Sequence, residues 1–144
     1  MSKWTVIGLI FLGICFITTS ATAGDFDGSK PLLFSAIKVF ECSPQGSCDE
    51  VTAESISLPQ FLKIDFKAKK VTPARKTAGK KGSDIQSMKV VDGKLMLQGA
   101  EDGVEGVRDG IGWTMAISEE TGKAILTASG EEVAFVVFGA CTPL

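Results

Sequence analysis

A regular alternation of apolar and polar residues, interrupted by tight-turn signals, is the feature that most constrains the fold. In residues 61–67, Leu62, Ile64 and Phe66 are separated by charged residues. This period of two places the apolar side chains on one face of a β-strand. The dipeptide Asp92-Gly93 lies between two further apolar runs, and it is the strongest short signal for a β-hairpin. The pattern therefore predicts antiparallel strands joined by tight turns.

Similar runs recur after residue 30 and predict an all-β chain of about eight strands joined in sequence order. They cover residues 32–42, 48–52, 61–67, 85–91, a segment beginning at 94, and then 111–118, 123–128 and 133–141. Short strands with tight turns favour an antiparallel meander that closes, or nearly closes, into a small barrel. The first and last strands are rich in apolar residues, so we expect them to pair and close the sheet. Residues 52–55 are expected to form one helical turn.

The composition narrows the possible chemistry. The chain has 144 residues, a formal net charge of −2, and neither His nor Tyr. The commonest general base and the commonest nitrogen ligand for metals are therefore absent. The balance of charge gives no sign of nucleic-acid binding, and no nucleophile motif such as Gly-x-Ser-x-Gly appears. We predict a protein that is not an enzyme, with no catalytic residue, cofactor, metal site or nucleic-acid partner.

The first 23 residues have the pattern of a cleaved signal peptide. Lys3 precedes an apolar run over residues 5–17, and Ala21-Thr22-Ala23 supplies the small-x-small site that signal peptidase reads. The apolar run is shorter than the roughly 20 residues that a membrane-spanning helix needs. We expect residues 1–23 to be removed.

Two alternatives for this segment are a retained membrane anchor and a lipoprotein. The lipoprotein is disfavoured because the bulky residue Ile14 stands before Cys15. Removal of the signal would leave residues 24–144 as a single β domain. We expect this domain to be periplasmic or secreted in a bacterium, with no stable membrane insertion.

Three cysteines remain after the predicted cleavage. Cys42 and Cys48 flank a short segment with Pro and Gly, and in an oxidising compartment such a close pair favours a disulfide. Zinc is a poor alternative without His or a fourth thiol, and the spacing does not suit redox catalysis. Pairing of the first and last strands would put residue 34 near Cys141 and place Cys42 roughly 26 Å away. We therefore expect Cys141 to be a free, buried thiol.

Two segments carry unusual charge. One is rich in cations and offers a possible patch for an anionic partner, formed by Lys67, Lys69, Lys70, Arg75 and Lys76. The alternative is a solvated hairpin and loop. The second segment, residues 101–110, holds four carboxylates but lacks the spacing of a calcium loop, and paired acids on a loop are weak support for glycosidase chemistry.

The opening of the predicted domain, residues 26–33 (FDGSKPLL), and its close, residues 135–142 (FVVFGACT), carry a resemblance. Together with shorter motifs between them, they resemble a family of small, uncharacterised exported proteobacterial proteins. The resemblance covers nearly all of residues 24–144. It implies export and supplies no activity. It also implies that relatives often carry Cys in place of Phe34, bridged to the equivalent of Cys141.

Two non-catalytic functions follow from these features. A small barrel can bind an apolar small ligand or a protein partner, and Trp113, Met115, Phe135 and Phe138 are candidates to line its pocket, although the same residues also suit a plain core. The alternative is an accessory, structural or inhibitor protein of a cell-envelope complex.

Overall fold

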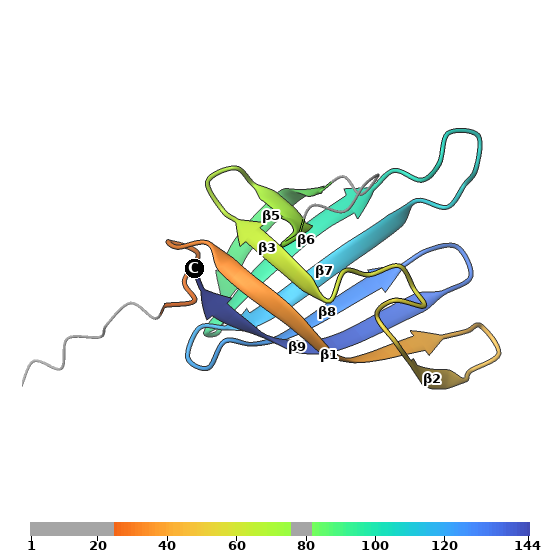
Figure 1. Cartoon of the computed structure of the whole chain (residues 1–144), viewed down its shortest axis with the longest axis horizontal. Helices are drawn as coiled ribbons and strands as arrows, with labels where there is room; N and C mark the ends of the chain where they lie inside the picture. The colour runs from red at the N-terminus through yellow and green to blue at the C-terminus, as the bar shows by residue number, and fades with distance from the viewer. Residues whose placement is uncertain (1–24, 76–81) are drawn as a thin grey trace, which may run out of the picture.

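The computed structural model describes residues 25–75 and 82–144, so the predicted signal peptide lies outside the described residues. The fold is all-β (Figure 1). The described strands are β1 (Leu32–Cys42), β2 (Cys48–Val51), β3 (Phe61–Asp65), β4 (Lys70–Pro73), β5 (Ser83–Val91), β6 (Lys94–Glu101), β7 (Ile111–Ser118), β8 (Lys123–Ser129) and β9 (Ala134–Pro143).

The strands form an antiparallel meander that closes into a barrel. The order is β2-β1-β3-β4-β5-β6-β7-β8-β9, and β1 also pairs with β9. One edge of β1 is shared, because its first half pairs with β3 and its second half with β2. Its other edge pairs with β9, where Phe34 is the partner of Cys141 and Cys42 is the partner of Ala134. The predicted fold class and the predicted closing pair are confirmed.

Two local expectations were wrong. The predicted strands omitted β4, which lies in the lysine-rich segment and contributes only Val71 to the core. Residues 52–55 do not form a helical turn. Residues 53–57 instead form hydrogen-bonded turns, in which Thr52 Oγ1 accepts the Ser55 N–H at 3.1 Å and Ala53 O accepts the Leu58 N–H at 2.8 Å.

Alternate side chains of the strands fill the barrel interior. The largest fully buried side chains are Leu32, Phe34, Ile64, Leu95, Leu97, Met115, Ile117 and Val137. Glycines make room for the aromatic rings, since a Cβ on Gly139 would overlap the Phe34 ring and one on Gly99 would overlap Trp113. Each of these two aromatic rings therefore lies over a glycine on a neighbouring strand. The missing side chain lets the ring pack closely in the core.

The segment before β1 closes one end of the barrel. The Phe26 ring packs against the core and occupies the space that a Cβ on Gly122 would need. The Asp27 carboxylate accepts the Ser29 N–H at 2.8 Å, which holds the turn around Gly28. In Figure 1 this segment lies beside the C-terminus, and the Leu144 N–H donates to Pro31 O at 2.9 Å.

Candidate functional site

The predicted disulfide is present beside the turn of the β1–β2 hairpin. Cys42 and Cys48 are cross-strand partners with a Cα–Cα distance of 4.1 Å, and their sulfurs are bonded. The Ser43 N–H donates to Ser47 O at 3.0 Å and tightens the same turn. The disulfide and the all-β structure fit an extracellular or periplasmic protein. The described residues include no helix that could span a membrane.

Cys141 has a free thiol that is buried beside Phe34. Burial raises the pKa of the Cys141 thiol to about 12. Because the thiolate is the nucleophilic form, this sulfur stays protonated and unreactive near neutral pH. Cys141 therefore behaves as a small apolar core residue and gives no support to covalent catalysis.

Of the four residues predicted to line a ligand pocket, Trp113 and Phe135 share a hollow, whereas Met115 and Phe138 are not among its lining residues. Met115 is fully buried in the core. Trp113 is also buried, and its Nε1 donates to Ser83 Oγ at 2.7 Å. Phe135 is partly buried near one end of β9. Phe138 lies on the outer face, where its ring meets that of Phe40 edge-on with centroids 6.1 Å apart.

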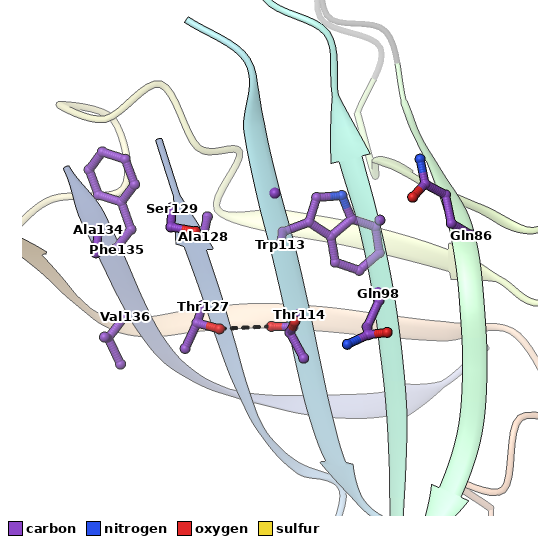
Figure 2. A pocket seen from close by; sticks show the side chains of 12 residues that line it. Gln86, Gln98, Trp113, Thr114, Thr127, Ala128, Ser129, Ala134, Phe135 and Val136 are labelled. Atoms are coloured by element: carbon purple, nitrogen blue, oxygen red, sulfur yellow. Dashed lines mark hydrogen bonds between the residues drawn. The ribbon is translucent and has the colours of Figure 1, made fainter. Parts of the chain in front are cut away.

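Trp113 and Phe135 do contribute to one open hollow of about 500 Å³. In Figure 2, Thr114 and Thr127 lie side by side, in the row next to the one that holds Trp113, Ala128 and Phe135. The Thr127 hydroxyl donates to Thr114 O at 3.5 Å. Residues 114 and 127 belong to a cross-strand row on the face opposite the buried side chains of β7 and β8. Trp113, Ala128 and Phe135 also line the hollow and belong to the neighbouring row on the inner face, so its lining combines polar and apolar residues from both faces of the sheet.

The outer face of β1, β8 and β9 carries apolar side chains in contact with solvent. We call Phe40, Ile125, Val136 and Phe138 the outer apolar wall. Ile125 and Phe138 are cross-strand partners, and each is more than 40% exposed, at 43% and 42%. Residues 133–138 are almost entirely apolar, so β9 presents apolar side chains on both of its faces. In the barrel, β9 lies between β8 and β1.

The predicted anion patch is split by the fold. Lys67 and Lys69 are exposed at the β3–β4 turn, and Lys70 forms a salt bridge of 2.6 Å with Asp84. Arg75 lies past the other end of β4, and Lys76 lies outside the described residues. The turn itself is held by Asp65, whose carboxylate accepts the Ala68 N–H at 3.0 Å, and this hydrogen bond lowers the pKa of Asp65.

The acidic loop is organised by its own carboxylate. Asp109 Oδ1 accepts the Val104 N–H at 2.7 Å. Across residues 25–75 and 82–144, no group of three or more His, Cys, Asp and Glu side chains is placed to hold a metal ion.

The sequence missed one feature, which is an unpaired edge of β5. β4 pairs with β5 only at Lys70↔Asp84 and Val71↔Ser83, although β5 continues to Val91. The run 85–91 predicted the strand correctly. Among the described strands, the edge of β5 lacks a partner because β4 begins at Lys70, opposite Asp84. No local pattern in the sequence predicts where β4 begins.

Comparison of the chain with protein-family models, with curated proteins and with solved structures finds no match.

Proposed function

We propose that this chain is an exported, non-catalytic domain that binds a protein partner through the outside of its barrel. The observation that carries the proposal is the distribution of apolar side chains. The interior is filled by large residues such as Phe34, Leu97 and Met115, each with no exposed surface, which favours binding on the outside of the barrel over binding inside it. Apolar side chains remain exposed on the outer apolar wall and along β5, and exposed apolar patches commonly mark interaction surfaces.

Export in this proposal means the periplasm or the extracellular space of a bacterium. It is supported by the Cys42–Cys48 disulfide, since such bonds persist in oxidising compartments. The absence of catalysis is supported by the unreactive Cys141 thiol, whose pKa burial raises to about 12. An accessory role in an envelope complex is one form that this partner binding can take.

The test is site-specific photo-crosslinking in cells that make the full chain. A benzophenone amino acid replaces Phe138 in one variant, Val90 in a second and Thr121 in a third. Phe138 and Val90 report on the two exposed apolar regions, and Thr121 is an exposed turn residue that serves as control. We expect one defined protein adduct from position 138 or 90, identified by mass spectrometry, and none from position 121.

The experiment can also contradict the proposal. If native mass spectrometry finds a stoichiometric small molecule in the purified protein, and neither apolar position forms a protein adduct, the partner-binding function is wrong. A small-ligand carrier would then replace it.

A further inference from the structure

The open edge of β5 has the features of a site for an added strand. The last backbone hydrogen bond between the β4 side and β5 runs from Ile85 N–H to Lys69 O at 2.8 Å. Beyond it, β5 extends past the first residue of β4, Lys70, while it stays paired with β6 as far as Val91↔Lys94. Within the described residues, the edge from Gln86 to Val91 that faces away from β6 has no strand partner.

The turn after β5 determines which backbone groups face this edge. Asp92 and Gly93 have φ values of 48° and 69° and form a two-residue turn closed by Val91 and Lys94. Such a turn closes on a hydrogen-bonded pair, and the pairs alternate along an antiparallel ladder. The N–H and C=O groups of Met88 and Val90 are therefore directed away from β6. An incoming strand can pair with both residues.

The side chains on this edge are apolar and accessible. Met88 is 49% exposed and Val90 is 48% exposed, although their cross-strand partners Leu97 and Leu95 are buried. Long, exposed apolar edges are usually blunted in proteins because they invite pairing with another chain. Here the only blunting charge between Met88 and Val90 is Lys89.

The unpaired charge around the edge is positive on balance. Among the described residues, Lys67, Lys69 and Lys89 form no salt bridge. Of the nearby carboxylates, Asp84 and Asp92 are paired with lysines, whereas Asp27, next to Gly28, and Glu119, whose N–H donates to Gly93 O, are in no salt bridge. The Lys69 backbone borders the point at which β5 loses its neighbour. Unpaired cations beside an open strand favour an acidic partner segment.

A hollow at the same end of the barrel can take a side chain of such a segment. It has a volume of about 470 Å³ and is lined by residues 29–31 and 65–68, which include Pro31 and Phe66. The adjoining residue Gly28 lies against Met88, with the Met88 sulfur 3.6 Å from the position of a Cβ on this glycine. The segment that supplies one wall of the hollow therefore also reaches the inner side of β5.

We propose that β5 accepts an additional strand from a protein partner, and that this strand is an extended acidic segment with apolar side chains at alternate positions. The proposal rests on the partner-binding function stated above and names the site and the class of partner. Backbone pairing supplies affinity in this mode of recognition, and side-chain pockets supply selectivity.

The test uses a synthetic peptide in which Glu and Val alternate, and a matched peptide in which Lys replaces each Glu. Binding to the isotope-labelled protein is followed by NMR. We expect the Glu peptide to shift the amide signals of Met88 and Val90 and to slow their hydrogen exchange. We expect the Lys peptide to bind at least about tenfold more weakly, because the charge around the edge is positive.

A pair of variants separates backbone pairing from side-chain contact. Val90→Pro removes an N–H that β6 does not use, and proline is tolerated on such edges. We expect it to weaken binding of the Glu peptide by about tenfold or more, whereas Val90→Ala retains the N–H and costs less. A peptide with alternate backbone nitrogens methylated tests the same hydrogen bonds without altering the protein, so a folding defect in Val90→Pro does not decide the outcome.

Charge is tested with the double variant Lys69→Glu, Lys89→Glu. We expect this double variant to bind the Glu peptide about tenfold more weakly. The control variant Lys123→Glu, an exposed change at the start of β8, should leave binding unchanged. Equal binding of the two peptides, or shifts at Phe138 and Ile125 in place of β5, would overturn the proposal. If the crosslinker at position 138 captures a protein while no peptide binds β5, strand addition is wrong and the partner-binding function stands.

Discussion

β1 and β9 are paired along almost their whole length, whereas β4 and β5 share only two register pairs. The first junction closes the barrel around Phe34 and Cys141, both buried. The second lets β5 extend alone with Met88 and Val90 half exposed. The same antiparallel meander therefore has a continuous closure on one side and an incomplete seam on the other.

This contrast separates stability from binding. Backbone groups in the β1–β9 junction are satisfied by each other, and the side chains behind them are close-packed, so changes there cost free energy of unfolding. At the seam, exposed side chains and unpaired backbone groups contribute little to the fold. They are free to contribute to association instead, as regions of low local stability often do.

The largest expected effect on stability comes from a disulfide across the β1–β9 junction. Phe34→Cys places a thiol opposite Cys141, and cross-strand partners lie within disulfide range. A bridge there closes a loop of about 100 residues, which the chain-entropy model values at about 4–5 kcal/mol. The variant also loses the packing of a fully buried ring, so the oxidised form should be close to the parent in stability and the reduced form far below it.

The measurement is the denaturant midpoint of this variant with and without reductant, after folding under oxidising conditions. The parent under the same two conditions controls for reduction of Cys42–Cys48, whose small loop is worth about 2 kcal/mol. Peptide mapping that shows Cys42 or Cys48 bridged to Cys141 in the parent would contradict the strand closure.

A second comparison deletes side chains on the two sides. Phe34→Ala should lower the free energy of unfolding by about 3–5 kcal/mol, because it leaves a cavity in the core. Val90→Ala should change it by less than about 0.5 kcal/mol, as expected for an exposed position. Urea denaturation of both variants measures the difference. Similar losses at the two sites would remove the distinction between a stabilising junction and a seam free for binding.

The sequence predicted the closed side well because its signals are local and strong. β1 and β9 are long and apolar, and antiparallel pairing of the two fixes which residues meet, so Phe34 opposite Cys141 follows from counting. The disulfide was predictable for the same reason, since Cys42 and Cys48 flank a turn.

Prediction from the sequence was weaker where a strand has only one buried apolar residue. β4 contributes only Val71 between a lysine and a threonine, which is too short for a period of two to be recognised. Phe138 was a pocket candidate and lies on the outer face of β9. Residues 133–138 are apolar on both faces, and such a run does not indicate which side is inside. Trp113 finds its partner Ser83 at a sequence distance of 30 residues, so only the folded sheet reveals it.

The Trp113–Ser83 hydrogen bond joins β7 to the start of β5. Its removal should lower the free energy of unfolding by an intermediate amount. Ser83 accepts from the indole and donates to Ala100 O at 3.3 Å. Ser83→Ala leaves the buried indole N–H without a partner, which should cost about 1–3 kcal/mol. Thermal unfolding measures this loss, and tryptophan fluorescence reports the altered environment of Trp113. Gly99→Ala, which pushes a methyl into the same ring, is the steric comparison. An unchanged melting temperature in Ser83→Ala would show that the contact does not hold the seam.

The smallest expected effect is a pH dependence that originates in the closed junction. The pKa of the Cys141 thiol rises from 9.0 to about 12 because of burial, so the folded state keeps its proton when the unfolded state has lost it. The unfolded state then binds fewer protons, and stability falls as the pH rises above 9.0 toward about 12. By about pH 9.5 the loss should stay below about 1 kcal/mol.

Urea denaturation at about pH 8 and about pH 9.5, for the parent and for Cys141→Ala, isolates this contribution because every other titrating group is common to both proteins. Only the parent should lose the increment, and an identical pH dependence in Cys141→Ala would mean that the thiol is not held in the dry interface between β1 and β9.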